Sequence, residues 1–219
     1  MPAFTPSPTY HPPSGAHLAR RIWGPGTFIL ALAAGILVLS GIYLAGTYNH
    51  LVRLDQQVQS QWAQVENVYQ RRADLVPNLV ETVKGAAGFE KSTLLAVTEA
   101  RARVQAPTGR APETPEELER YQQQQEQLGA ALSRLMVVVE AYPQLKATEN
   151  FRDLQSQLEG TENRIAVERM RFNEAARSFN STRDSFPTNL VAGMFGHRFI
   201  EKGYFKAREQ AYQPPKVQF

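Results

Sequence analysis

Arg72 is a charged residue inside an otherwise apolar helical stripe, between Tyr69 and Val76. A guanidinium buried without a carboxylate or carbonyl partner would cost several kcal/mol. We therefore expect Arg72 to pair across a helical bundle with an acidic residue, and the pattern places Glu162 and Glu140 nearest. Such a pair would fix the register of the packed helices. The alternatives at this position are a ligand or partner site inside the bundle and, less favoured, catalysis.

A second set of polar residues follows one face of a later segment. Its members project within about 40° of one another if 3.6 residues make a turn, and they are Glu162, Arg169, Asn173 and Asn180. They lie beside an apolar stripe rather than opposite it. Together with Arg72 and Glu140 they form a predicted structural polar network.

The residue constellations that common enzyme mechanisms need are missing from the sequence. Absence of cysteine excludes thiolate nucleophiles and disulfides. No two of the four histidines, which are His11, His17, His50 and His197, stand at metal-ligand spacing. Phosphate-binding glycine loops and GxSxG elbows are absent too. We predict a protein that is not an enzyme, with no catalytic, cofactor-binding or metal-binding residues.

A long uncharged segment precedes the helices that carry these residues. From Ile22 to Val52 there is no Asp, Glu, Lys or Arg, and a helix of about 20 residues spans the hydrocarbon core of a bilayer. Its centre, from Phe28 to Leu44, is apolar on every side, as lipid requires. We predict a single transmembrane helix over residues 22–48. A cleaved signal peptide is the stronger alternative, and a buried core helix is the weaker one.

The charges that flank this segment predict its orientation. Arg20 and Arg21 stand close to its N-terminal side, whereas Arg53 on the other side is offset by Asp55. We expect the N-terminus in the cytoplasm and the C-terminal domain outside it. Residues 1–21 are rich in proline and cannot bury a core, so we expect a disordered cytoplasmic tail.

The first helix after the predicted membrane segment should run without a break through Lys84. Its apolar residues recur at steps of three and four, and they are Leu51, Leu54, Val58, Trp62, Val65, Val68, Tyr69, Leu75, Val76, Leu79, Val80 and Val83. Pro77 should bend this helix because it removes one backbone hydrogen bond. Gly85 and Gly88 should end it.

Two further helices are predicted from composition and capping signals. The second covers about 89–104, and a loop rich in proline follows it. The third begins with Thr114 as its N-cap and Pro115 at its first position. Steps of three and four continue along it up to Tyr142, and Pro143 closes it.

The fourth predicted helix opens near Asn150 and ends before Pro187. Apolar residues recur along it at steps of seven, and they are Phe151, Leu158, Ile165, Phe172, Phe179 and Phe186. Such steps indicate long helices that pack side by side at shallow angles. Because no segment alternates with period two, we predict an all-α fold, an antiparallel bundle of about four long helices over residues 49–188.

The C-terminal segment over residues 189–219 contains many aromatic residues without regular spacing. We expect these side chains to pack against the end of the bundle or the membrane surface. A docking site for another subunit or protein is the alternative.

Three stretches of the chain carry a resemblance to a known family. They are RRADLVPNLVETVKG at 71–85, EAYPQLKA at 140–147 and FRDLQSQLEGTEN at 151–163. In order and spacing, residues from about 48 to 204 resemble the LemA family of bacterial proteins. This resemblance implies an N-terminal anchor and an α-helical bundle, and it implies no particular activity.

These observations favour a membrane-bound scaffold or assembly protein of the bacterial envelope, which associates with itself and with other envelope proteins. An accessory factor that regulates a membrane-bound enzyme such as a protease is the alternative. The expected partners are the lipid bilayer, further copies of the chain and other envelope proteins. A net charge of only +3, scattered along the chain, argues against nucleic acid.

Overall fold

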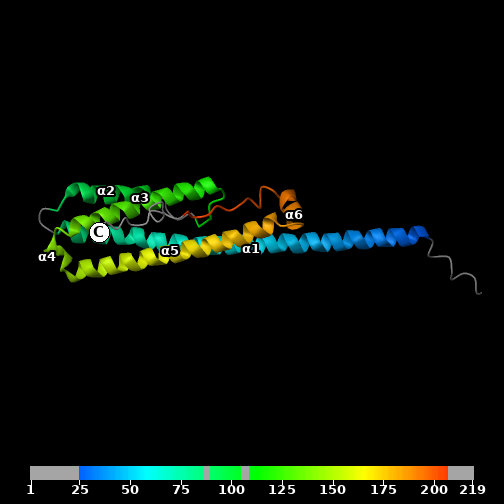
Figure 1. The fold of residues 1–219 in the computed structure, drawn as a ribbon, viewed down its shortest axis with the longest axis horizontal. Coiled ribbons are helices and arrows are strands. Elements are labelled where there is room, and N and C mark those ends of the chain that lie inside the picture. Colours follow the sequence, from blue (N-terminus) through cyan, green and yellow to red (C-terminus); the bar gives the residue numbers. More distant parts are fainter. Residues whose placement is uncertain (1–24, 86–88, 105–108, 207–219) are drawn as a thin grey trace, which may run out of the picture. The chain divides into compact units, whose positions relative to one another are not determined.

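The computed structural model describes residues 25–85, 89–104 and 109–206. Those ranges contain no strand (Figure 1), and their helices are α1 (Pro25–Lys84), α2 (Lys91–Arg103), α3 (Pro115–Val139), α4 (Pro143–Lys146), α5 (Glu149–Asp184) and α6 (Thr188–Met194). The predicted all-α class is therefore confirmed. The predicted tail over residues 1–21 and the terminator Gly88 lie outside the described residues.

The chain divides into two compact units, residues 1–46 and 47–219, and α1 contributes residues to both. Within the first unit, residues 26–46 are all exposed and none is charged. Among the described residues, α1 is the one helix long and apolar enough to cross a membrane. A helix with an apolar surface on every side suits lipid rather than water. The predicted N-terminal transmembrane helix fits this observation.

Buried side chains of the second unit form two clusters. The aromatic core comprises Leu51, Val58, Trp62, Val65, Tyr69, Ala111, Leu118, Tyr121, Ile165, Phe172, Ala175, Ala176, Phe179, Ala192, Phe199 and Phe205. The aliphatic core comprises Leu75, Val76, Leu79, Val80, Val83, Phe89, Leu94, Val97, Ala100, Leu128, Leu132, Leu135, Val139, Leu145, Phe151 and Leu158. Helices α1, α3 and α5 contribute to both clusters, so these three helices extend through both cores.

The predicted start of α3 is confirmed by its cap. The Thr114 hydroxyl accepts a hydrogen bond from the Glu117 backbone N–H at 3.3 Å, and Pro115 is the first helical residue. The seven-residue series along α5 is buried as far as Phe179. Its extension to Phe186 was wrong, because α5 ends at Asp184 and the Phe186 side chain is 80% exposed.

Helix α1 continues through Pro77 and ends at Lys84. Proline has no N–H, so the carbonyl four residues earlier, at Ala73, loses its helical hydrogen bond. Arg101 of α2 donates to that carbonyl from Nε at 2.9 Å. This hydrogen bond joins α2 to α1 and replaces the one that Pro77 removes. The bend expected at Pro77 stays a prediction.

After α6 the chain continues without a helix through residues 199–206, which we call the C-terminal strap. Figure 1 shows this stretch leaving α6 and running back beside the bundle. Phe199 and Phe205 of the strap are buried in the aromatic core. These two aromatic side chains pack against the bundle, one of the two alternatives that the sequence left open.

Candidate functional site

A polar layer separates the two cores. Arg72 lies between Tyr69 of the aromatic core and Leu75 of the aliphatic core on α1. Gln125 of α3 and Glu162 of α5 occupy the equivalent positions between the two clusters. The helical periodicity that buries the flanking residues therefore points one polar residue of each helix into the same level of the bundle.

The Arg72 side chain is held by both of the other helices. Its Nη2 donates to the Gln125 backbone carbonyl at 2.8 Å and to Gln125 Oε1 at 2.7 Å. Its Nη1 lies 3.3 Å from Glu162 Oε2. The guanidinium also stands over the Tyr69 ring, 5.0 Å from its centroid. Side-chain exposure is 3% for Arg72 and 41% for Glu162, so the ion pair lies at the edge of the bundle.

The structure does not bring Glu140 to Arg72. Helix α3 ends at Val139, and Glu140 instead binds Lys146 Nζ at 2.6 Å with both side chains exposed. Fifteen residues separate Glu140 from Gln125, which is about 22 Å along a helix at 1.5 Å per residue. Of the two expected partners, only Glu162 lies at the level of Arg72, and the choice of Glu140 was wrong.

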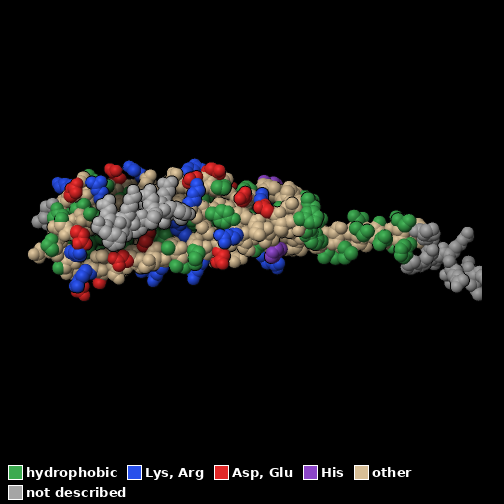
Figure 2. Space-filling view, in the orientation of Figure 1, with side chains coloured by type: hydrophobic (Ala, Val, Ile, Leu, Met, Phe, Trp, Pro, Cys, Tyr) green, Lys and Arg blue, Asp and Glu red, His purple; other side chains and the backbone are tan. Residues whose placement is uncertain are grey.

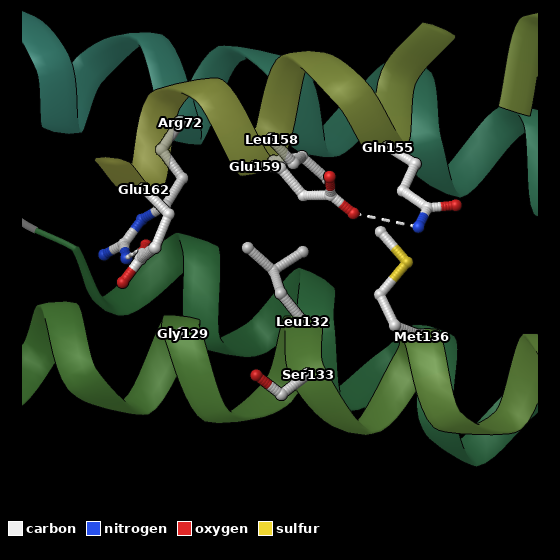
Figure 3. A pocket seen from close by; sticks show the side chains of 9 residues that line it. All are labelled: Arg72, Gly129, Leu132, Ser133, Met136, Gln155, Leu158, Glu159 and Glu162. Atoms are coloured by element: carbon white, nitrogen blue, oxygen red, sulfur yellow. Dashed lines mark hydrogen bonds and ion pairs between the residues drawn. The ribbon is translucent and has the colours of Figure 1, made fainter. Parts of the chain in front are cut away.

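A pocket of about 250 Å³ opens beside the polar layer, between α3 and α5. Figure 3 shows Arg72 and Glu162 at one end of this pocket and Met136 at the other, with Leu132 and Leu158 between them. One end is therefore charged, and the rest combines the apolar Leu132, Leu158 and Met136 with the polar pair of Gln155 and Glu159. This arrangement can accept a small side chain, but it provides no nucleophile with an adjacent base.

Tyr121 lies in the aromatic core next to the polar layer. Burial raises the pKa of the Tyr121 phenol, and the neighbouring Tyr69 and Glu66 raise the pKa further. A hydrogen bond with Gln125 acts in the opposite direction. The Tyr121 ring packs edge-on against the rings of Trp62 and Tyr69, with centroids 4.9 and 5.6 Å away.

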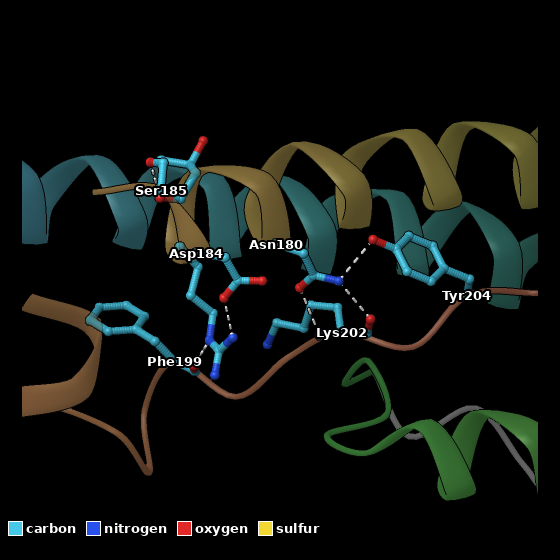
Figure 4. A network of polar contacts seen from close by, with 8 residues as sticks. Asn180, Asp184, Ser185, Phe199, Lys202 and Tyr204 are labelled. Atoms are coloured by element: carbon cyan, nitrogen blue, oxygen red, sulfur yellow. Dashed lines mark hydrogen bonds and ion pairs between the residues drawn. The ribbon is translucent and has the colours of Figure 1, made fainter. Parts of the chain in front are cut away.

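The two asparagines of the predicted α5 stripe bind the backbone of the C-terminal strap (Figure 4 shows Asn180). Asn180 Nδ2 donates to the Lys202 carbonyl at 2.8 Å, and Asn180 Oδ1 accepts from the Lys202 N–H at 2.9 Å. Asn173 does the same for Phe205, at 2.9 and 2.8 Å. Each amide thus satisfies both polar groups of one strap residue, much as a neighbouring strand would.

Gln122 of α3 extends the same arrangement from the other side. Its Nε2 donates to the Lys206 carbonyl at 3.2 Å, and its Oε1 accepts from the Lys206 N–H at 3.1 Å. Arg169 adds a bond to the Lys206 carbonyl at 2.6 Å, and Arg183 binds the Phe199 carbonyl at 2.7 Å. We call the surface formed by Gln122, Asn173 and Asn180 the amide groove.

Side chains of the strap fix its position along the groove. The Phe205 ring stacks on Trp62 at an interplanar angle of 11°, with the ring centroids 6.2 Å apart. Lys202 is buried and its Nζ lies 2.7 Å from Asp55 Oδ1. Gly203 passes so close to α3 that an added Cβ would lie 2.9 Å from the Pro115 Cα. Only glycine fits at that crossing.

All four predicted stripe residues of α5 make contacts, but with different partners. Glu162 joins the polar layer, whereas Arg169, Asn173 and Asn180 hold the strap. The sequence did not predict the roles of the Gln122 and Gln125 amides on α3 or the pair between Lys202 and Asp55. One signal was available, because Gln125 stands at an apolar position of the α3 stripe between Tyr121 and Leu128.

The described ranges hold no group of three or more His, Asp or Glu residues that could bind a metal ion. Helix α1 is suited to a membrane, and a helical bundle follows it. These two features place the chain in the class of membrane-anchored helical proteins. The model of the LemA family matches residues 61–219. The chain belongs to the LemA family.

Three relatives illustrate what this chain is similar to. Magnetosome protein MamQ of Magnetospirillum gryphiswaldense is 26% identical over 210 residues, which cover 87% of this chain and 76% of that protein. Magnetosome protein MamQ 2 of Paramagnetospirillum magneticum is 29% identical over 203 residues, with coverage of 82% and 73%. Protein LemA of Metamycoplasma hominis is 26% identical over 165 residues, with coverage of 75% and 72%. None of these names denotes an enzyme.

Proposed function

We propose that this protein is a non-catalytic scaffold of the bacterial envelope, anchored in the cell membrane by α1 and associated with further copies of itself. The observation that carries the proposal is what the polar side chains bind. Arg72, Asn173 and Asn180 are engaged in holding helices and the strap in place. A domain built in this way offers a fixed surface to partners.

The similarity to proteins named for the magnetosome supports the same proposal. Two relatives that align with more than four fifths of this chain carry that name, and the chain is proposed to share a non-catalytic role with them. A metal-dependent catalytic role would need a cluster of ligands, and the described residues hold no group of three or more His, Asp or Glu that could bind a metal ion.

Self-association is tested on the full chain in lipid nanodiscs by native mass spectrometry and by cross-linking in the native membrane. We expect discs that hold two or more copies, and cross-linked species at multiples of the chain mass. A single copy per disc at every protein concentration, with no cross-linked multiples in the membrane, would contradict the scaffold.

The orientation of the domain is part of the proposal, and the natural absence of cysteine makes it testable. Leu95 on α2 is 61% exposed, so Leu95→Cys offers one thiol on the surface of the second unit. A membrane-impermeant maleimide should label this thiol in spheroplasts before lysis. Labelling that appears only after lysis would place the domain in the cytoplasm.

The pocket beside Arg72 favours a second candidate function, an accessory factor that binds a membrane enzyme. Its open mouth and its combination of charged and apolar walls can accept a side chain of a partner. Purification after cross-linking separates the two functions. A scaffold yields copies of this chain, whereas an accessory factor yields an unlike protein whose recovery falls when Ser133→Arg, at an exposed position that lines the pocket, blocks it.

A further inference from the structure

Four large apolar side chains on α6 and next to its ends are exposed. Their exposed fractions are 80% for Phe186, 60% for Leu190, 69% for Met194 and 40% for Phe195. Leu190 and Met194 lie one helical turn apart, so they share a face. Figure 2 shows hydrophobic side chains concentrated at the end of the second unit, where Figure 1 places α6. We call these four residues the α6 patch.

The α6 patch adjoins Tyr48, the second residue of the second unit. The Phe195 ring centroid lies 5.0 Å from that of Tyr48. Along the chain, Tyr48 follows the last residue of the exposed apolar stretch, Gly46, by two positions. Two residues correspond to about 3 Å of helical rise. The headgroup layer extends roughly 5–8 Å beyond the hydrocarbon core, so Tyr48 and its ring partner belong at headgroup depth.

The charges around the patch are compatible with a lipid surface. Arg198 and Arg53 are exposed basic residues on neighbouring segments. The nearby carboxylate of Asp184 is paired with Arg183, and Glu201 is an exposed acidic residue of the same stretch. Apolar side chains bordered by arginines are the composition that binds at the interface of a bilayer.

We propose that the α6 patch inserts into the interface of the bilayer that α1 crosses. The second unit is then tied to the membrane through α1 and also through α6. The occupant is lipid and not a second copy, because the bilayer already begins within a few residues of Tyr48. This inference goes beyond the scaffold function and stands for a single copy as well as for an assembly.

Spin labels test the proposal in the full chain. Leu190→Cys and Met194→Cys each provide one labelling site in a protein without cysteine. Leu95→Cys on α2 and Met170→Cys on α5 are matched controls, because these residues are 61% and 62% exposed. Each variant is reconstituted in liposomes, and the accessibility of the label is measured to oxygen, which partitions into lipid, and to a water-soluble nickel complex.

We expect the ratio of oxygen to nickel accessibility to be several-fold higher at residues 190 and 194 than at residues 95 and 170. Equal ratios at all four sites would show that the patch faces water and would overturn the proposal. An immobilised label shielded from both reagents would show that protein covers the patch, which would also overturn it. Circular dichroism checks that each labelled variant keeps the helix content of the parent, and the two patch sites report independently.

Discussion

The aromatic core and the aliphatic core of the second unit are assembled in different ways. Members of the aliphatic core lie between residues 75 and 158, and they come from helices that follow one another along the chain. The aromatic core joins residue 51 to residue 205, and it is incomplete without the strap. The first depends on helical periodicity alone, whereas the second also depends on a non-helical segment held by side-chain amides.

The polar layer marks the level at which one core gives way to the other. Arg72 bonds to both Gln125 and Glu162 there, so a shift of α1 along its axis relative to α3 or α5 would break the layer. Apolar contacts are non-directional and tolerate such shifts, but hydrogen bonds to a buried guanidinium do not. We propose that the layer keeps these three long helices, which have similar apolar stripes, in one register.

The largest effect is expected from removing the centre of the polar layer. Arg72→Ala leaves the buried Gln125 acceptors without their donor, and we expect the free energy of unfolding to fall by about 3 kcal/mol. Arg71→Ala, at an exposed neighbouring position, is the control and should change it by less than about 0.5 kcal/mol. Denaturant unfolding of the full chain in detergent measures both. Equal stabilities of the two variants would show that the polar layer does not stabilise the fold.

Gly203→Ala tests the dependence of the aromatic core on the strap. The new Cβ would lie 2.9 Å from the Pro115 Cα, so the strap must move away from α3. We expect a loss of about 2 kcal/mol by overpacking. Gly193→Ala serves as the control, because a Cβ there meets nothing within 4 Å. Trp62 fluorescence should report a changed environment in Gly203→Ala only.

Asn180→Ala tests the amide groove directly. The substitution removes both bonds to Lys202 in a buried place, and we expect a loss of about 2 kcal/mol. Asn163→Ala is a control on the same helix, since that side chain is exposed. Thermal unfolding followed by circular dichroism compares them. If the melting temperatures of both variants match the parent, the groove does not hold the strap in solution.

Tyr121, a residue of the aromatic core, should make the free energy of unfolding depend on pH. The folded state raises the pKa of this phenol above the ordinary value of 10.0. The folded state therefore holds the proton more tightly, and its stability is complete below about pH 10 and declines as the pH rises further, by at most about 1.4 kcal/mol per unit. Tyr121→Phe should lack this component, so above pH 10 the parent should lose stability more steeply than the variant. Parallel curves would show that the phenol is not responsible.

The smallest effect is expected at the junction of α2 with α1. Arg101→Met removes the donor to the Ala73 carbonyl, with an expected loss of about 1 kcal/mol. Pro77→Ala restores the helical N–H for the same carbonyl, so in that background Arg101→Met should cost less. A double-mutant cycle by denaturant unfolding measures the coupling. Additive losses would mean that Arg101 does not replace the bond that Pro77 removes.

Much of the helical architecture follows from the sequence because its signals are local. The N-cap at Thr114 and the steps of three and four along α1 and α3 depend only on nearby residues. The error at Phe186 arose because the seven-residue series was carried past the helix end at Asp184. Periodicity specifies a face, but it does not specify where that face stops.

The candidate site was only partly predictable for a different reason. The sequence indicates that Arg72 needs a partner, but it offers Glu140 and Glu162 on equal terms until the axial positions of the helices are known. The strap has no period, and its backbone bonds to α5 and α3 join residues 16 to 84 positions apart. Amide side chains bind the strap through its backbone, so the binding does not require particular side chains in the strap. Gly203 is the one strap residue whose type the close approach to α3 requires.

Amide hydrogen exchange of the strap tests the central claim most directly, because Lys202, Phe205 and Lys206 donate their N–H groups to the amide groove. We expect these three amides, in the full chain in detergent micelles, to exchange orders of magnitude more slowly than an unstructured peptide of the same sequence. Asn180→Ala should accelerate exchange at Lys202 first. Exchange at the rate of the free peptide in the unaltered protein would contradict the claim that the strap completes the aromatic core.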